Sequence, residues 1–318
     1  MGIPKLNKYL TERCTNKSIG KKHLSYLSNK ILVIDTSIYM YKFISHGDLL
    51  EDMYLFISIL LEYSIIPIFI FDGKPPPEKK SLLIKRNDDK KKAESEYNIL
   101  YEQLQRDISD KEQEEKIKRE MLLLKKKCIR LKDRDIRSVK NLMDAYGVTY
   151  FDAINEADEL CAYLINNNIA YGCISDDMDM FMYGCKYIIR HLSLLNHTMI
   201  VYDYNEICNN LNLNDTDLKD ILLLSGTDYD LSNHNNIYDV FNWHKEYSET
   251  EENALDFYNY VNKNKKELDI DNILNLKNMF ICNNNYNDLY KDIIISNKNP
   301  NKNDIKTILE PIGFFWTN

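Results

Sequence analysis

The sequence predicts an α/β protein whose mostly parallel central sheet has helices on both faces. Short apolar runs rich in Ile, Val and Phe alternate with segments of helical periodicity, the order expected of parallel strands joined by crossover helices. Acidic side chains follow several of these runs directly, and the carboxyl edge of such a sheet is where ligands bind. The expected strands are residues 31–34, 65–71, 170–174, 187–191 and 199–202.

Length and composition are those of a soluble globular protein. The chain has 318 residues, 44% hydrophobic and 28% charged, enough for one elaborated α/β domain.

The apolar stretch 53–71 is broken by Glu62 and Pro67, so we expect a core helix and a strand rather than a membrane span. The N-terminus lacks the apolar core of a signal peptide. Seven scattered cysteines without a CxxC pair argue against a zinc site or a disulfide framework. We therefore expect an intracellular, soluble protein.

The formal net charge of −8 is unevenly distributed along the chain. Residues 1–140 carry a net +8, and the remaining residues carry −16. A basic half that faces phosphates and an acidic half that carries metal ligands explain this asymmetry better than a uniformly acidic protein does. A solvated charged surface is the alternative reading of any single run of charges.

Residues 86–140 interrupt the α/β pattern. The segment is dense in charged residues, contains neither Gly nor Pro, and is compatible with one or two long helices. From composition alone, a solvated helical hairpin or coiled coil is favoured. Residues 231–318 read mainly as helices separated by Asn- and Lys-rich loops, and the terminal aromatic residues Phe314, Phe315 and Trp316 are expected to pack onto the domain. The expected domains are thus a core of residues 1–230 with this insertion, and a helical C-terminal region.

A single carboxylate and two cations lie close together after the second expected strand. Asp72 follows the apolar run, and a proline-stiffened turn leads to Lys79 and Arg86. Seven residues are two helical turns, so the two cations are expected on one helix face. A carboxylate at this sheet edge can hold a divalent metal, and two cations above it would neutralise a phosphate. This combination predicts phosphodiester chemistry.

Several other acids occupy positions that can meet at the same edge. Asp35 ends the first expected strand, and Asp228 follows a helical segment. Two acids lie in the expected first turn of a helix that Asn155 would cap, although acids favour helix N-termini even without a metal. So many carboxylates would repel each other unless cations neutralised them, and Mg²⁺ prefers such oxygen ligands. The candidate metal ligands are Asp35, Asp72, Glu156, Asp158, Asp177, Asp179 and Asp228.

Five sequence blocks resemble the flap endonuclease (FEN/XPG-type) family of structure-specific 5′ nucleases. They read MGIPKL, FDGKPP with the following Lys and Arg, NEADELCAYL, SDDMDMFMYG and LSGTDYD, in the family's order. The opening strand ILVIDTSIYMYKF is similar to the same family. The resemblance covers about residues 1–90 and 125–230 and implies a PIN/FEN-like fold. Abundant Asn, Lys, Ile and Tyr suggest AT-rich codon usage, as in a viral or protozoan genome, and fit a viral member of the family.

The resemblance implies roles for individual residues. It assigns the seven acids to the metal site. Asp176 is an extra acid in SDDMD, expected either to lie behind the metal ligands or to be a residue of the turn. It assigns catalytic phosphate neutralisation to Lys79 and Arg86, and makes the segment 86–140 a helical arch over the active site. The residues implied in DNA binding are Gly2, the stacking Tyr41, Lys90, Lys91 and Lys92 in one cluster, and Lys125, Lys126 and Lys127 in the other.

The implied activity is two-metal hydrolysis of DNA phosphodiesters by a 5′ nuclease, endonuclease or exonuclease, serving replication, repair or recombination. The implied cofactors are two Mg²⁺ ions, with Mn²⁺ as a substitute. The expected partners are DNA with 5′ flaps, nicks, gaps or free 5′ ends. The C-terminus has no sliding-clamp peptide, because Ile308 stands where such a peptide has Gln and Pro311 interrupts its turn. We expect a monomer in the nucleus or at a cytoplasmic site of viral replication.

One departure and two alternatives qualify these implications. After GTDY the family usually has a glycine-rich turn within a helix–two-turn–helix element that binds potassium and downstream duplex. Here residues 230–237 contain no glycine, so a degenerate element is expected near residues 225–245. The alternatives are a 5′→3′ exoribonuclease of the XRN type and a non-catalytic DNA-binding replication scaffold.

Overall fold

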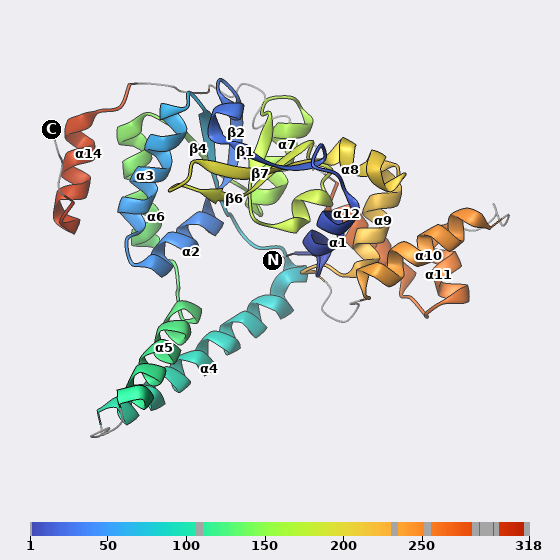
Figure 1. The fold of residues 1–318 in the computed structure, drawn as a ribbon, viewed down its shortest axis with the longest axis horizontal. Helices are drawn as coiled ribbons and strands as arrows, with labels where there is room; N and C mark the ends of the chain where they lie inside the picture. The colour runs from blue at the N-terminus through green and yellow to red at the C-terminus, as the bar shows by residue number, and fades with distance from the viewer. Residues whose placement is uncertain are drawn as a thin grey trace.

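A seven-stranded mixed sheet forms the centre of the protein (Figure 1). The computed structural model describes residues 2–105, 111–229, 235–250, 256–281, 286, 295 and 299–314. The strand order is β1-β7-β6-β5-β2-β3-β4, and the five strands from β6 to β4 are parallel to their neighbours. β1 and β7 complete the sheet with antiparallel pairing. The predicted fold class is confirmed.

All five expected strands are present, with ends shifted by one or two residues. They are β2 (Ile31–Asp35), β3 (Ile66–Phe71), β5 (Gly172–Ile174), β6 (Tyr187–Ser193) and β7 (Thr198–Asp203). Two further strands, β1 (Ile19–His23) and β4 (Thr149–Asp152), were not predicted from the sequence. Both are edge strands with largely unburied side chains, so neither produces the apolar run by which buried strands are found.

Two hydrophobic cores lie on opposite faces of the sheet because side chains alternate along each strand. In β2, Val33 belongs to one core, whereas Leu32 and Ile34 belong to the other. The first core is covered by α1 (Leu6–Arg13), α7 (Ala157–Asn166), α8 (Tyr204–Leu211) and α9 (Asp215–Ser225). The second is covered by α2 (Thr36–His46), α3 (Leu49–Glu62), α6 (Asp133–Tyr146) and α14 (Lys302–Leu309).

The apolar stretch 53–71 divides into the end of α3 and β3, as expected, and both pack in the second core. No helix in the described part of the chain is long and apolar enough to span a membrane.

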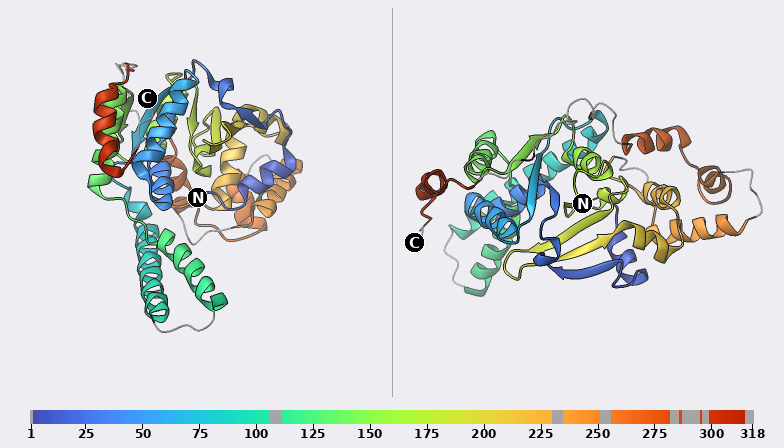
Figure 2. Two further views of the ribbon diagram at one scale, coloured as in Figure 1. Left: turned by 60° about the vertical axis from the view of Figure 1, so that its left-hand side comes forward. Right: turned by 90° about the horizontal axis from the view of Figure 1, so that it is seen from above.

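The charged insertion forms a helical hairpin that projects from the core (Figures 1 and 2). Its helices are α4 (Lys80–Leu104) and α5 (Lys111–Lys127), which pack against each other along their length. Ile117, Met121 and Leu124 of α5 and Ala93 of α4 supply the buried seam. The hairpin therefore starts before residue 86, and residues 133–140 belong to α6 in the core rather than to the insertion.

The segments after residue 231 lie at two ends of the molecule. α10 (Ile237–Glu249), α11 (Phe257–Asn264) and α12 (Ile270–Met279) lie beside α9, whereas α14 packs on α6 (Figure 1). Phe314 contacts the ring of Tyr54 with 5.0 Å between ring centroids, so it packs onto the core as expected. Phe315 and Trp316 lie outside the described residues.

Candidate metal and phosphate site

The carboxyl ends of β2 and β3 place two of the expected acids side by side. Asp35 is the last residue of β2, and its register partner in β3 is Ile70, two residues before Asp72. Asp35 is 5% exposed, and Ser175 donates a 3.3 Å hydrogen bond from its hydroxyl to one carboxylate oxygen of Asp35. The parallel register therefore brings the two acids to one edge of the sheet.

Asp72 binds the N-terminus of α7. Its Oδ1 accepts a 2.9 Å hydrogen bond from the main-chain N–H of Ala157, the first residue of the helix. Gly73 allows this approach, because a Cβ there would lie 2.0 Å from the carbonyl oxygen of Ala153. The expected cap residue was wrong: Glu156 occupies the N-cap position, while Asn155 donates from Nδ2 to Glu159. The Asp72 carboxylate performs the capping instead, from another part of the chain.

The loop after β5 carries two further acids. Asp177 caps a short 3₁₀ helix (Met178–Phe181), with its Oδ1 accepting a 3.0 Å hydrogen bond from the N–H of Asp179. Asp177 in turn donates its own N–H to the hydroxyl of Ser175. The tight turn therefore directs both carboxylates to the same side of the loop.

Three of the expected acids converge closely. One carboxylate oxygen from each of Asp177, Asp179 and Asp228 lies within 4.8 Å of the other two. Among the described residues, one buried carboxylate oxygen of Asp35, of Asp158 and of Asp179 has no hydrogen-bond partner. Unpartnered buried carboxylate oxygens are costly unless a cation compensates them.

Burial and mutual repulsion raise the pKa of three carboxyls well above the ordinary range. Burial is the main cause for Asp35, Asp158 and Asp179. Neighbouring carboxylates raise these pKa values further: Asp72 acts most on Asp35, Asp35 on Asp158, and Asp177 on Asp179. The charged form of each group is thus disfavoured in the protein alone, which is the electrostatic condition of a site that binds a cation.

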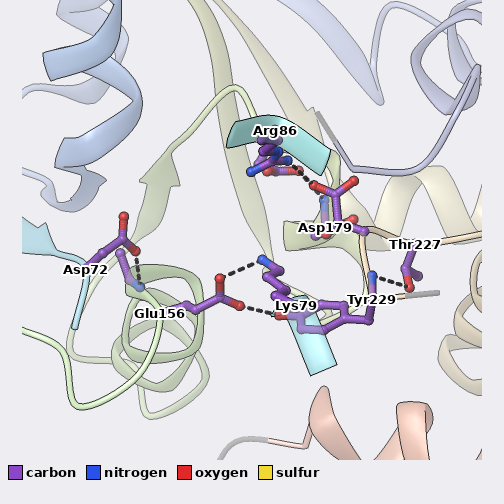
Figure 3. Close-up of polar contacts among 10 residues, drawn as sticks. Asp72, Lys79, Arg86, Glu156, Asp179, Thr227 and Tyr229 are labelled. Atoms are coloured by element: carbon purple, nitrogen blue, oxygen red, sulfur yellow. Dashed lines mark hydrogen bonds and ion pairs between the residues drawn. The ribbon is translucent and has the colours of Figure 1, made fainter. Parts of the chain in front are cut away.

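The two expected cations reach this group of acids from the start of the hairpin (Figure 3). Lys79 donates a 2.6 Å hydrogen bond from Nζ to Glu156, and Arg86 donates a 2.7 Å hydrogen bond from Nη2 to Asp228. Lys79 ends a 3₁₀ turn (Pro77–Lys79) just before α4, so the two residues do not share one regular helix as the spacing predicted. Burial lowers the pKa of Lys79, but Glu156 and other acids outweigh burial and leave it raised.

Tyr229 is a member of the site that the sequence analysis did not single out. Its hydroxyl donates a 2.5 Å hydrogen bond to Glu156, and the Nζ of Lys79 lies 4.5 Å from its ring centroid (Figure 3). Ser175, described above, was missed as well. Both residues stand in the recognised blocks SDDMD and GTDYD, so their position beside acids was the available signal.

The residues expected to bind DNA lie in three places: the N-terminal segment, α2 and the helical hairpin. A Cβ on Gly2 would lie 2.4 Å from Oδ1 of Asp177, so the N-terminal backbone passes directly against that carboxylate. Tyr41 on α2 is 43% exposed, and the Nζ of Lys90 lies 5.3 Å from its ring centroid. The remaining lysines lie on the hairpin with exposed side chains: Lys91, Lys92, Lys125, Lys126 and Lys127.

The donor set fits a divalent cation that prefers oxygen. The three converging groups are carboxylates, and among the described residues Asp179, Asp35 and Asp158 each have a buried carboxylate oxygen without a partner. Hard cations such as Mg²⁺ and Mn²⁺ select such ligands, whereas zinc sites favour Cys and His. Asp176 lies outside this group, because its Oδ1 accepts a 2.8 Å hydrogen bond from the N–H of His191.

Family models match the two halves of this site. The XPG N-terminal domain matches residues 1–93, and the XPG I-region matches residues 147–228. The chain belongs to the flap endonuclease/XPG family of nucleases. The resemblance seen in the sequence is therefore confirmed, and the family's enzymes are hydrolases of phosphodiester bonds.

Individual relatives of the flap endonuclease/XPG family share just over a quarter of their residues with this chain. Flap endonuclease 1 of Methanococcus aeolicus is 29% identical over 234 residues, which cover 68% of each protein. "Probable RAD2-like endonuclease 369L" of Invertebrate iridescent virus 6 is 28% identical over 293 residues, which cover 76% of this chain and 69% of the viral protein. The matched regions span as little as 46% of a relative's length, in Theileria annulata.

Solved structures of the family share the fold. The catalytic core of Rad2 in complex with a DNA substrate has a TM-score of 0.64 at 17% identity, and the match covers 98% of this chain and 95% of that one. Flap endonuclease-1 from Methanococcus jannaschii has a TM-score of 0.61 at 21% identity, with 93% and 91% coverage. These matches confirm the nuclease fold that the sequence implied.

Proposed function

We propose that this chain is a divalent-metal-dependent 5′ nuclease that hydrolyses DNA phosphodiesters at flaps, nicks, gaps or free 5′ ends. The observation that carries the proposal is the convergence of Asp177, Asp179 and Asp228, with unpartnered buried oxygens of Asp35 and Asp158 nearby. Family membership supports nuclease chemistry, and the matched Rad2 structure contains a DNA substrate. Replication, repair or recombination would supply such DNA.

The seven acids are proposed to hold two Mg²⁺ ions, for which Mn²⁺ could stand in. When bound, the ions activate the attacking water and stabilise charge on the leaving oxygen. Asp35, Asp158 and Asp179 would supply their unpartnered buried oxygens, and Asp72 would hold the N-terminus of α7, where Glu156 and Asp158 lie. Metal binding would lower the raised pKa values of these carboxyls and keep them ionised.

Lys79 and Arg86 are proposed to neutralise the scissile phosphate. Each now donates to a carboxylate of the site, so a small rotation of either side chain can redirect its donor to a phosphate oxygen. Charge stabilisation of this kind acts mainly in the transition state. Tyr229 supports Lys79 by holding Glu156 from the other side.

The surrounding elements are proposed to guide the DNA strand. The hairpin would act as the family's arch, with its exposed lysine clusters along the strand's phosphates. Tyr41 would stack on a base once Lys90 leaves its ring. Helices α9 and α10 flank residues 226–236, and this degenerate helix–two-turn–helix element would hold the downstream duplex.

The proposal is tested by digestion of a matched panel of substrates. Flapped, nicked, gapped, blunt and single-stranded DNAs, together with RNA of the same sequence, would be incubated with Mg²⁺ or with chelator. We expect Mg²⁺-dependent cleavage of DNA near 5′ junctions or ends, absent in the Asp179→Ala variant. Preferential degradation of RNA would favour the exoribonuclease alternative, and binding without turnover would favour the scaffold alternative.

A further inference from the structure

Arg190 is a buried cation below the metal-facing loop. It lies in β6, is 6% exposed, and extends its guanidinium toward residues 176–178. Its Nη2 donates a 2.8 Å hydrogen bond to the main-chain carbonyl of Asp176, and its Nη1 contacts the thioether sulfur of Met178. One planar group therefore contacts both residues that flank Asp177, the main chain of Asp176 and the side chain of Met178.

The strand around Arg190 is irregular, and this irregularity allows its backbone to form a hydrogen bond with the same loop. Pairing between β6 and β7 shifts between Arg190 and Ser193, and His191 has φ of 51°, which few non-glycine residues adopt. The N–H of His191 thereby points at Asp176 and donates to its carboxylate. On the other side of Arg190, the carbonyl of Ile189 accepts a 3.1 Å hydrogen bond from the N–H of Ser175. Three consecutive residues of β6, Ile189 to His191, thus contact Ser175, Asp176 and Met178 of the loop.

Arg190 also ties the loop to the N-terminal helix. Its Nη1 lies 3.3 Å from Oδ1 of Asn7 in α1, and the hydroxyl of Tyr202 donates to the same oxygen at 2.5 Å. The segment that precedes α1 carries Gly2, whose backbone lies against Asp177 and Asp179. The guanidinium is therefore a common anchor for two segments that meet at the acids.

The surroundings of this cation are unusual for a structural arginine. The acceptors of its described hydrogen bonds from Nη1 and Nη2 are uncharged, and its buried Nε has no hydrogen-bond partner among the residues that the structure describes. Burial of a guanidinium is costly without opposite charge. The acids across the loop supply that charge at longer range, so a purely structural role would be served at lower cost by an apolar side chain.

We propose that Arg190 is a positioning residue for the metal site: it holds the loop so that Asp177 and Asp179 present their carboxylates together. This inference rests on the proposed metal-dependent function. Residues that orient metal ligands typically change metal affinity by roughly 10- to 100-fold when they are removed. Arg190 does not face the reacting phosphate, so its effect should appear in metal binding rather than in affinity for DNA.

The test compares Arg190→Gln and Arg190→Lys with the wild-type chain and with Arg137→Gln, an exposed arginine on α6. Mn²⁺ binding without DNA would be measured by calorimetry, thermal unfolding would be recorded in chelator, and single-turnover cleavage would be followed across a Mg²⁺ titration. We expect both Arg190 variants to bind Mn²⁺ roughly 10- to 100-fold more weakly, with the Arg137 control and KM for DNA near wild type.

The lysine variant separates positioning from charge. Lysine keeps the positive charge but cannot donate hydrogen bonds in several fixed directions, as the planar guanidinium does. If Arg190 acted only through its charge, Arg190→Gln would bind Mn²⁺ more tightly and Arg190→Lys would be unchanged, and either result would overturn the proposal. If Arg190→Gln fails to fold, Asn7→Ala removes one anchor while keeping the cation, and we expect a smaller loss of Mn²⁺ affinity in the same direction. Unchanged Mn²⁺ affinity in that variant would likewise overturn the proposal.

The outcomes for the wild-type chain distinguish this inference from the proposed function. Wild-type protein that binds Mn²⁺ but cleaves no substrate would contradict the nuclease proposal, and the comparison of variants would still decide the role of Arg190. Wild-type protein that binds no Mn²⁺ would overturn both.

Discussion

The ammonium of Lys79 lies 2.6 Å from Oε1 of Glu156, deep in a site where most neighbouring groups are acidic. Arg86 makes the equivalent contact with Asp228 at 2.7 Å. Each expected phosphate-binding cation is thus held by an expected metal ligand. Because Lys79 is 8% exposed, its charge is poorly screened by solvent and would act strongly on a phosphate that entered the site. The contacts keep both cations beside the place where phosphate and metal are proposed to meet.

Asp179→Ala and Asp35→Ala should abolish cleavage without loss of DNA binding. Each substitution deletes a proposed metal ligand, so we expect single-turnover rates to fall by more than about 100-fold, the upper range for residues that only orient ligands. DNA affinity should be equal or higher, because one negative charge facing phosphate is removed. Quench-flow kinetics and anisotropy would measure the two effects. Retained Mg²⁺-dependent activity in Asp179→Ala would refute the proposed site.

Lys79→Ala and Arg86→Ala should each slow the chemical step by roughly 10²- to 10³-fold, as loss of one positioned electrostatic donor does. Ground-state DNA affinity should change little, because this charge matters most in the transition state. Lys80→Ala, an exposed lysine next to Lys79, serves as the control. A loss of affinity with normal turnover at saturation would show that the two residues only hold DNA.

Gly2→Ala should impair activity more than stability. A Cβ at Gly2 would lie 2.4 Å from Oδ1 of Asp177 and 2.6 Å from Oδ1 of Asp179, so the acids or the N-terminal segment must move. A misplacement of about 1 Å can cost about 100-fold in rate. Gly47→Ala is the matched control, because Gly47 also has positive φ but has no atom within 4 Å of the added Cβ. Equal rates for the two variants would contradict the close approach of Gly2.

Without metal, the stability that three buried carboxyls contribute should fall as pH rises above their ordinary pKa of 3.8. The pKa values of Asp35, Asp158 and Asp179 are raised in the folded state above the ordinary 3.8, so the folded state binds more protons than the unfolded state in this window. The stability from these groups is present at low pH and is lost as pH rises through their folded pKa values. Thermal unfolding in chelator would show this trend.

Asp35→Asn provides the control for that pH dependence. The asparagine side chain does not titrate, so this variant loses one carboxyl with a raised pKa. In chelator, the Tm of the variant relative to wild type should therefore increase with pH, and this difference should shrink when Mg²⁺ is added. A Tm difference independent of pH would mean that Asp35 is not protonated in the metal-free protein.

Potassium and downstream duplex should matter less to this protein than to a family member with an intact glycine turn. Residues 230–234 lie outside the described part of the chain, but Asn235 donates from Nδ2 to the carbonyl of Leu224 at 2.7 Å, which ties the segment to α9. Without glycines, fewer main-chain groups can converge on an ion. Exchange of potassium for sodium at fixed ionic strength, with shortened duplexes, would measure this. A strong potassium-specific requirement would contradict the prediction.

The sequence by itself determined the fold class and the candidate chemistry. Apolar runs define the buried strands, because a strand covered on both faces must be continuously hydrophobic. The acids that follow these runs, with Lys79 and Arg86, point to metal and phosphate before any coordinates are known. The edge strands β1 and β4 were not predicted, because their side chains are largely unburied and their sequences contain no continuous apolar run.

Only the tertiary structure decided which groups touch. Asp72 caps α7 across a separation of 85 residues, and Arg190 contacts Asn7 across 183. No local pattern encodes such contacts, because they depend on strand register, the bulge in β6 and the approach of Gly2, which are set by packing of the whole sheet. The sequence could name the acids, whereas their convergence, their raised pKa values and the anchor beneath them arise from burial, which exists only in the folded chain.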